Sequence, residues 1–147
     1  MGDIMLLGKS LSTLDEKKRM IIPSKFRSYF HNNEIVIVSK GFEGCLVIRN
    51  EIEFIKWQDK ILSQSEGQKE ARILARQVFA NSEELTIDSK GRINIPHSLL
   101  TLADIKQKVI MIGLSNKIEI WSETNWNSFN QDTKDKFESA AAALDEI

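Results

Sequence analysis

The chain has 147 residues, of which 28% are charged and 41% hydrophobic, and its net charge is −1 at pH 7. This length suffices for one compact domain or for two small modules that share a core. The sequence contains no apolar run of the roughly 18 residues that a membrane-spanning helix needs. The single cysteine, Cys45, and the two histidines, His31 and His97, exclude an internal disulfide and a closed Cys/His zinc site.

Residues 1–7 lack the basic stretch and the long apolar segment of a secretory signal. We therefore expect a cytoplasmic, metal-free protein without a cofactor. The charge is unevenly distributed: residues 1–33 hold six basic and three acidic side chains, a net +3, whereas residues 119–147 hold two basic and seven acidic ones, a net −5. Because electrostatic binding depends on local patches more than on total charge, this distribution predicts a basic face and an acidic tail.

In chain order, the first half predicts a strand, a basic turn at residues 15–19, a second strand, a short helix and two further strands. Pro23 suits the first turn of a helix, in which Phe26 and Phe30, four residues apart, would share one face. Residues 35–38 are a continuous apolar run typical of a buried strand. A turn at residues 41–44 separates them from the next strand.

Helical sequence follows at residues 51–62 and 68–80, joined near residues 63–67. In the second of these helices the spacing predicts an apolar stripe and a basic one. The apolar stripe consists of Ala71, Leu74, Ala75 and Val78, and the basic one of Lys69, Arg72 and Arg76.

The second half of the chain repeats the first. Residues 14–23 return as residues 87–96 at a constant offset of 73, and Asp, Lys, Arg, Ile and Pro recur position by position. Ile93 and Ile95 alternate with Asn94, the pattern of a strand with one buried face. Pro96 then opens a helix whose apolar side holds Leu99, Leu100 and Ala103. A repeat of half the chain means that each structural unit occurs twice.

The repeat continues beyond this helix. Residues 109–112 correspond to the buried strand of the first half, and a turn is expected at residues 113–116. The offset then drops to 72, so that Leu46 matches Ile118 and Ile48 matches Ile120. Ser122 is a candidate cap of a last helix carrying Trp126, Phe129 and Phe137, whose alanine-rich end at residues 140–144 is expected to fray.

The doubled Asp-x-Lys-Gly-Arg-x-x-x-Pro turn resembles that of the MraZ family of bacterial transcriptional regulators, as does the stretch Ile118-Glu119-Ile120-Trp121…Trp126. The resemblance covers nearly the whole chain. It implies an α+β fold in which two swapped-hairpin (AbrB-like) β-rich units form a pseudo-symmetric interleaved barrel, with helices after each unit. We accordingly expect units at residues 1–50 and 81–121, connecting helices at 51–80, and a C-terminal helix and tail at 122–147.

The resemblance also implies a function. Members of the family assemble into a ring and bind repeated boxes in the promoter of the division and cell-wall gene cluster, which implies double-stranded DNA as the partner and association with the nucleoid. The DNA-contacting turn of the family maps onto two sets of residues in this chain. They are Lys17, Lys18 and Arg19, and Lys90, Gly91 and Arg92, with Asp15 and Asp88 shaping the turns.

Each of these residues has an alternative role. The planar fork of Arg19 and Arg92 suits two hydrogen bonds to guanine or to a phosphate, but the same arginines could instead pair with the aspartate of their own turn. Lys17 and Lys90 suit phosphate contacts as flexible point charges, or they are solvated turn lysines. Carboxylates repel phosphate, so the aspartates are expected to form the turns.

Lys18 departs from the pattern, because it stands where the family motif and the second copy have glycine. If this position needs a positive φ, lysine costs roughly 1 kcal/mol more than glycine, and it adds a charge at the tip of the turn. Otherwise the first turn has a different shape.

An enzyme is not expected, because the sequence has no Gly-rich phosphate loop, no Gly-x-Ser-x-Gly motif and no cluster around a histidine. No small-molecule substrate is evident either. The alternative function is an antitoxin-like or scaffold module on the same fold, with weak DNA binding. The stripe of Lys69, Arg72 and Arg76 either extends a DNA path or is a solvated face paired with Glu66 and Glu70.

Overall fold

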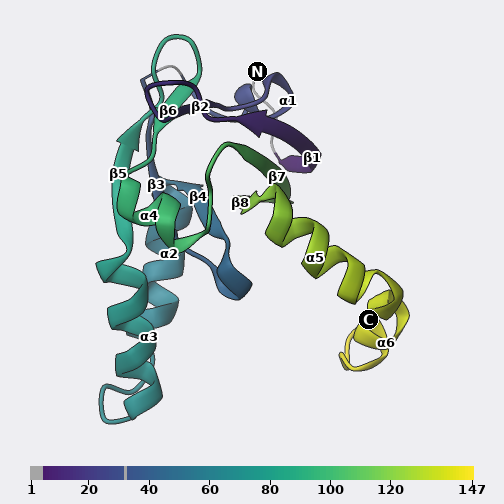
Figure 1. Ribbon diagram of the computed structural model, residues 1–147. Helices are drawn as coiled ribbons and strands as arrows, with labels where there is room; N and C mark the ends of the chain where they lie inside the picture. Colours follow the sequence, from purple (N-terminus) through teal and green to yellow (C-terminus); the bar gives the residue numbers. More distant parts are fainter. Residues whose placement is uncertain (1–4, 32) are drawn as a thin grey trace.

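A computed structural model describes residues 5–31 and 33–147 (Figure 1). Residues 1–4, which belong to the segment considered for a signal, lie outside the described residues. The first half forms β1 (Leu6–Thr13), β2 (Arg19–Ile21), α1 (Ser24–Arg27), β3 (Ile35–Lys40), the 3-10 turn η1 (Phe42–Gly44), β4 (Leu46–Asn50), α2 (Glu51–Leu62) and α3 (Lys69–Ala80). The second half forms β5 (Ser82–Thr86), β6 (Arg92–Asn94), α4 (His97–Leu102), β7 (Lys108–Ser115), β8 (Ile118–Ser122), α5 (Glu123–Thr133), the 3-10 turn η2 (Lys134–Lys136) and α6 (Phe137–Ala142). The expected mixed α+β class is confirmed.

Six strands form one antiparallel sheet in the order β1-β7-β8-β4-β3-β5. In this order β1, from the first half, pairs with β7 of the second half, and β5, from the second half, pairs with β3 of the first. The first strand of each half is therefore added to the hairpin of the other half. Because β4 and β8 join the two hairpins in the middle of the sheet, neither half completes its part of the sheet alone.

The sheet is linear rather than closed. β1 and β5 are its edge strands, and the remaining strands, β2 and β6, pair with each other in a separate two-stranded ribbon. The pairings among the described strands therefore interleave the two halves but do not form the closed barrel that the resemblance implies.

A pseudo-two-fold axis relates the two halves. In the β2·β6 ribbon, Met20 lies opposite Ile93, and these residues are 73 positions apart in the repeat. In the β4·β8 pair, Val47 lies opposite Glu119, which are 72 positions apart and again equivalent. Since both pairings are centred on equivalent residues, the axis passes through the middle of the ribbon and the middle of the sheet.

The main core contains side chains from both halves. Met20 and Ile93, on the inner face of the ribbon, are each 1% exposed, and they join a cluster with Phe26 of α1 and Leu99 and Leu100 of α4. Burial of a side chain of this size contributes about 1.5–3 kcal/mol. The core therefore holds the ribbon, α1 and α4 against the sheet.

The longer helices extend from the other side of the sheet. α2 and α3 form a hairpin against β3 and β4, and α5 packs on β7 and β8 (Figure 1). A second apolar cluster, centred on buried Trp121 and including Trp126 and Phe129, attaches α5. No helix among residues 5–31 and 33–147 is long and apolar enough to cross a membrane.

Several predicted features are found at or within one residue of the predicted position. α2 spans residues 51–62, and Asn50 caps it by accepting a hydrogen bond from the Glu53 N–H at 2.8 Å. α3 begins one residue later than predicted. Ser122 caps α5, because its Oγ accepts a hydrogen bond from the Asn125 N–H at 3.0 Å.

Other predictions were wrong in detail. The helix after Pro23 is a single turn that ends at Arg27, although Phe26 and Phe30 are both buried as their spacing suggested. β7 continues to Ser115, so it contains most of the turn expected at residues 113–116. Phe137 is not on the helix capped by Ser122, because α5 ends at Thr133 and η2 intervenes. Phe137 begins α6 and is 81% exposed, so most of its ring is not packed against the residues that the structure describes.

Candidate nucleic-acid interface

The two basic turns have the same hydrogen-bond geometry. In the first turn, Asp15 Oδ1 accepts from the N–H groups of Lys17 at 2.8 Å and Arg19 at 2.9 Å, and Oδ2 accepts from Arg19 Nε at 2.8 Å. In the second turn, Asp88 Oδ1 accepts from the N–H groups of Lys90 at 2.9 Å and Arg92 at 2.8 Å, and Oδ2 from Arg92 Nε at 2.7 Å. One carboxylate thus shapes each turn and also holds its arginine.

The same hydrogen bonds lower the pKa of both carboxyl groups. The backbone N–H of Arg92 is the largest cause, the Arg92 side chain and the Lys90 N–H add to it, and together they bring the pKa of Asp88 to about 2. The pKa of Asp15 is lowered by the equivalent groups, first of all the Arg19 N–H. Both carboxylates are therefore ionised at neutral pH, which keeps each arginine paired.

The pairing of arginine with aspartate, considered above as an alternative to nucleic-acid contact, is present but leaves the guanidinium groups available. Only Nε of Arg19 and of Arg92 is used, and the two side chains are 26% and 28% exposed. Their Nη atoms make no hydrogen bond to any residue that the structure describes. The terminal fork of each arginine is thus free to bind, while the paired Nε fixes its direction.

Lys18 has the left-handed backbone conformation that the motif reserves for glycine. Its φ is 63°, and φ at the equivalent Gly91 is 78°. The backbone hydrogen bond from this residue to the turn aspartate is also conserved between the copies, at 3.0 Å from Lys18 to Asp15 and 2.9 Å from Gly91 to Asp88. The first turn therefore does not have a different shape, and lysine is accommodated in a strained conformation.

The β2·β6 ribbon brings the two arginines onto one face. Arg19 lies opposite Asn94, and Ile21 lies opposite Arg92. Residues directly opposite each other in an antiparallel pair share a face, and alternate residues of a strand do too. Arg19 and Arg92 are thus diagonal neighbours on the face opposite buried Met20. The Cα atoms of such a pair are roughly 7–8 Å apart.

Sequence reasoning did not include the two other residues of this ribbon face, Ile21 and Asn94, which are both exposed. The available signal was the period of two in each strand, since each of them is two positions from its own arginine. With Ile21 and Asn94, this face of the ribbon is a small continuous surface, and the two arginines are not isolated charges.

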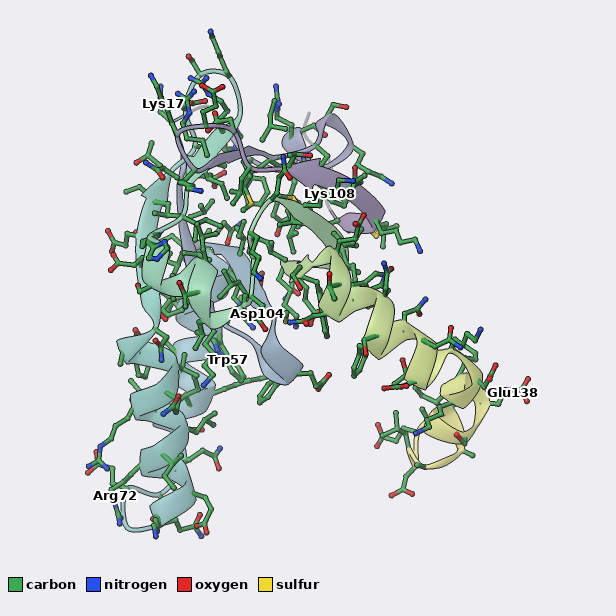
Figure 2. The ribbon with its side chains drawn as sticks, viewed as in Figure 1. Lys17, Trp57, Arg72, Asp104, Lys108 and Glu138 are labelled. Atoms are coloured by element: carbon green, nitrogen blue, oxygen red, sulfur yellow. The ribbon has the colours of Figure 1, made fainter. Side chains whose placement is uncertain are left out.

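The other basic and acidic segments lie away from the turns. Figure 2 shows Lys17 at the ribbon end of the molecule and Arg72 at the far end of the α2–α3 hairpin. Lys69, Arg72 and Arg76 are all exposed, and Arg72 Nη1 donates to the Glu66 carbonyl oxygen at 2.9 Å rather than to a carboxylate. Glu138, in the acidic C-terminal segment, is also remote from the turns (Figure 2).

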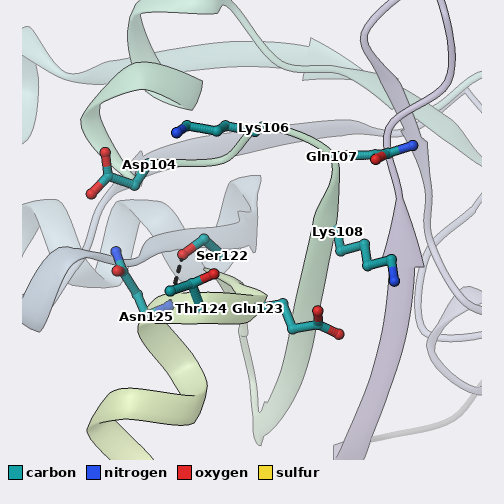
Figure 3. A pocket seen from close by; sticks show the side chains of 8 residues that line it. All are labelled: Asp104, Lys106, Gln107, Lys108, Ser122, Glu123, Thr124 and Asn125. Atoms are coloured by element: carbon teal, nitrogen blue, oxygen red, sulfur yellow. Dashed lines mark hydrogen bonds between the residues drawn. The ribbon is translucent and has the colours of Figure 1, made fainter.

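A polar pocket of about 390 Å³ lies between the α4–β7 loop and the start of α5 (Figure 3). Its lining includes two lysines, Lys106 and Lys108, and two carboxylates, Asp104 and Glu123, so its charges balance. The described residues contain no group of three or more His, Cys, Asp or Glu side chains that could hold a metal ion. Cys45 is buried, and this burial, with Glu119 nearby, raises the pKa of its thiol to about 12. The two turns are accordingly the best-defined candidate site.

Comparison with known proteins gives the family. A family model described as "MraZ protein, putative antitoxin-like" matches the chain twice, at residues 5–77 and 78–147. This chain belongs to the MraZ family. Each of the two matches covers one of the two repeats of this chain, and each therefore contains one basic turn.

Relatives in the MraZ family match over almost their whole length. A protein of Mesoplasma florum is 40% identical over 141 residues, which are 96% of this chain and 96% of that protein. One of Mycoplasmoides gallisepticum is 37% identical over 97% of this chain and 99% of its own length, and one of Limosilactobacillus reuteri is 36% identical over 95% and 97%. Each is named as the transcriptional regulator MraZ. The family resemblance inferred from the doubled turn is thereby confirmed.

Proposed function

We propose that this member of the MraZ family is a sequence-specific DNA-binding transcriptional regulator that reads DNA with its two basic turns. The observation that carries the proposal is the outer face of the β2·β6 ribbon. There Arg19 and Arg92 lie side by side, each held by an ionised aspartate. The names of the relatives support regulation of transcription as the role.

The ribbon matches the dimensions of DNA. The major groove is about 12 Å wide and admits a two-stranded β-ribbon. With the ribbon in the groove, the free Nη atoms of Arg19 and Arg92 would meet base edges, where a bidentate contact with guanine O6 and N7 contributes about 1–3 kcal/mol of discrimination. Asp15 and Asp88 act here as positioning residues, because they aim the arginines without touching the DNA.

The lysines of the turns are proposed to contact the phosphate backbone. Lys17, Lys18 and Lys90 lie at the two ends of the ribbon and are exposed. In the groove they would flank the arginines on either side, where phosphate contacts fix the register of the protein without reading sequence. The Gly91 N–H is already hydrogen-bonded within the turn. We therefore propose that Gly91 lets the turn backbone approach the DNA closely and adds no charge.

We also propose that several chains assemble and bind repeated boxes in the promoter of the division and cell-wall gene cluster, within the nucleoid. Exposed apolar side chains on the outer face of the β1 edge support assembly: Leu7 is 61% exposed, Leu11 is 56% exposed, and Leu114, opposite Leu7, is 40% exposed. The exchange of β1 and β5 between the halves supports the swapped-hairpin architecture. It also supports units at residues 1–50 and 81–121, with the remaining segments (51–80 and 122–147) as appended helices.

A protein-interaction module is the second candidate function. The description of the matching family model includes the term antitoxin-like, and the α2–α3 hairpin has exposed apolar side chains, Ile52, Ile55 and Leu62. Exposed apolar side chains of this kind favour a protein partner that binds away from the turns. On this alternative, substitutions in the turns would leave the main activity intact.

The proposal is tested by comparing Arg92→Ala with Lys17→Ala on duplexes that carry the promoter boxes and their single-base variants. Arg92→Ala should cost about 1–3 kcal/mol per engaged unit and relax the base preference at one position, whereas Lys17→Ala should weaken binding to all sequences alike. Arg72→Ala serves as the control, because it removes one arginine from the far end of the molecule. Equal and sequence-independent losses in Arg92→Ala and Lys17→Ala would show that the turns contact only the backbone of DNA and would contradict sequence-specific reading.

A further inference from the structure

The two basic turns differ in the number of their cationic side chains. The first contains three cations, Lys17, Lys18 and Arg19, whereas the second has two, Lys90 and Arg92, because its tip is Gly91. The first turn also contains Glu16 where the second has Ser89, so the net charge of each turn is +1. Since the turns otherwise share their hydrogen bonds and backbone conformation, what the second turn lacks is a cation at its tip.

A guanidinium from the other half of the chain lies against this tip. A Cβ atom added to Gly91 would collide with the side chain of Arg27, at Cζ, Nε and Nη2. Arg27 is the last residue of α1, and its Nη2 donates to the Ile22 carbonyl oxygen at 3.2 Å. The Ile22 N–H in turn donates to the Gly91 carbonyl oxygen at 2.8 Å. Arg27 is thus held directly beside the backbone of the second turn.

The rest of the Arg27 guanidinium has little to bind within the chain. Its Nε is buried without a hydrogen-bond partner among the described residues, and no described residue accepts a hydrogen bond from Nη1. A charged group that is only partly satisfied in a folded protein is costly. Nε is enclosed by the protein, so Nη1 is the nitrogen of Arg27 that is left to bind an acceptor from outside the chain.

The first turn has the reverse arrangement. The residue equivalent to Arg27 in the repeat, 73 positions later, is Leu100. Leu100 and Lys18 line the same pocket of about 330 Å³ beneath the first turn. The first turn therefore has a charged tip over an apolar residue, and the second has a glycine tip over a charged residue.

We propose that Arg27 is the third DNA-contacting cation of the second turn, where it supplies the charge that Lys18 supplies at the first. This inference rests on the proposed function. Phosphate is the group that we expect Arg27 to bind. A guanidinium beside the turn backbone would face the same DNA phosphates that we propose for the turn lysines. Glycine suits position 91 for two reasons: it adopts the positive φ of 78° without the strain that Lys18 bears, and a side chain there would displace the guanidinium.

The proposal is tested by rebuilding the second turn as a copy of the first. Arg27→Leu should weaken binding to the promoter duplex about tenfold at 0.1 M salt and make the salt slope shallower by about one unit, as expected for one lost phosphate contact. Lys18→Ala should have an effect of the same size. Adding Gly91→Lys to Arg27→Leu should restore affinity and slope, since the space vacated by the guanidinium admits the lysine and returns its charge.

Two further variants keep the test decisive. Arg27→Gln removes the charge but keeps an N–H donor for the Ile22 carbonyl oxygen. If leucine disturbs α1, the binding of Arg27→Gln is compared with that of the wild type instead. Arg27→Lys should retain the salt slope. Wild-type binding by folded Arg27→Leu and Arg27→Gln would overturn the inference, as would a folded Arg27→Leu/Gly91→Lys protein that stays weak. The failure of the proposed function is distinguishable, because the variant Arg19→Ala/Arg92→Ala would then also bind like the wild type.

Discussion

At the scale of single residues, the turn aspartates connect the fold to the proposed function. Asp15 and Asp88 each accept two backbone hydrogen bonds and one from an arginine Nε. The same carboxylate therefore closes the turn and aims the guanidinium. This explains why aspartate and arginine recur together four residues apart in both copies, and why pairing within the turn and contact with DNA are compatible.

The pH dependence of stability should reveal these aspartates. The pKa of Asp88 is about 2 in the folded protein and 3.8 for the free group. A lowered folded-state pKa means that the stabilisation is fully present above about pH 4 and is lost as the pH falls toward 2. We expect the melting temperature of the wild type to fall more steeply between pH 5 and pH 2 than that of Asp15→Asn/Asp88→Asn, whose amides do not titrate. Parallel curves, measured by circular dichroism, would contradict this assignment.

Lys18 should be a site of local strain. Its φ of 63° lies in the left-handed region, so Lys18→Gly should stabilise the fold by about 1 kcal/mol and raise the melting temperature by roughly 2–4 °C for a chain of this size. Lys18→Ala is the matched control, because it removes the charge but keeps the Cβ and its strain. If Lys18→Gly is no more stable than Lys18→Ala, the strain is absent.

At the scale of elements, local sequence patterns predicted the bounds and faces of those helices and strands that are stabilised by residues near in sequence. α2 has its predicted bounds because its cap and apolar spacing are both encoded within residues 50–62. The buried and exposed faces of β6 followed from the alternation of Ile93, Asn94 and Ile95. α1 is shorter than predicted, because the apolar spacing of Phe26 and Phe30 satisfies burial without requiring continuous helix.

Other elements depend on contacts that the pattern does not contain. The pairing of β1 with β7 and of β5 with β3 joins segments from opposite halves, and only the family resemblance pointed to it. The contact of Arg27 with Gly91 joins residues that are 64 positions apart. Nothing in the pattern around either residue predicts that contact.

The difference between α5 and α6 yields a prediction at this scale. The Phe129 ring lies 5.1 Å from that of Trp121, centroid to centroid, whereas Phe137 is 81% exposed. Phe129→Ala should lower the free energy of unfolding by about 2 kcal/mol through lost packing, and Phe137→Ala should change it by less than about 0.5 kcal/mol. Chemical denaturation measures both values. A large loss from Phe137→Ala would show that α6 packs on the protein in solution.

At the scale of the whole molecule, the fold separates the charges. The ribbon with both turns lies at one end, and the α2–α3 hairpin and the acidic C-terminal segment extend from the sheet on the other side (Figures 1 and 2). A protein of net charge −1 can therefore present a basic surface at the ribbon end, where we propose that DNA binds. The pseudo-two-fold axis through Met20 and Ile93 makes that surface nearly symmetric, like the two strands of a duplex.

The most direct test is the salt dependence of binding to labelled promoter DNA by three proteins. These are the wild type, Arg19→Ala/Arg92→Ala, and the control Arg72→Ala/Arg76→Ala, which removes the same charge from α3. We expect a steep slope of log affinity against log salt for the wild type and for the control, and weaker binding with a shallower slope for the folded ribbon variant. Equal binding by all three proteins, or a loss confined to the Arg72→Ala/Arg76→Ala control, would contradict the assignment of the paired turns as the DNA-reading surface.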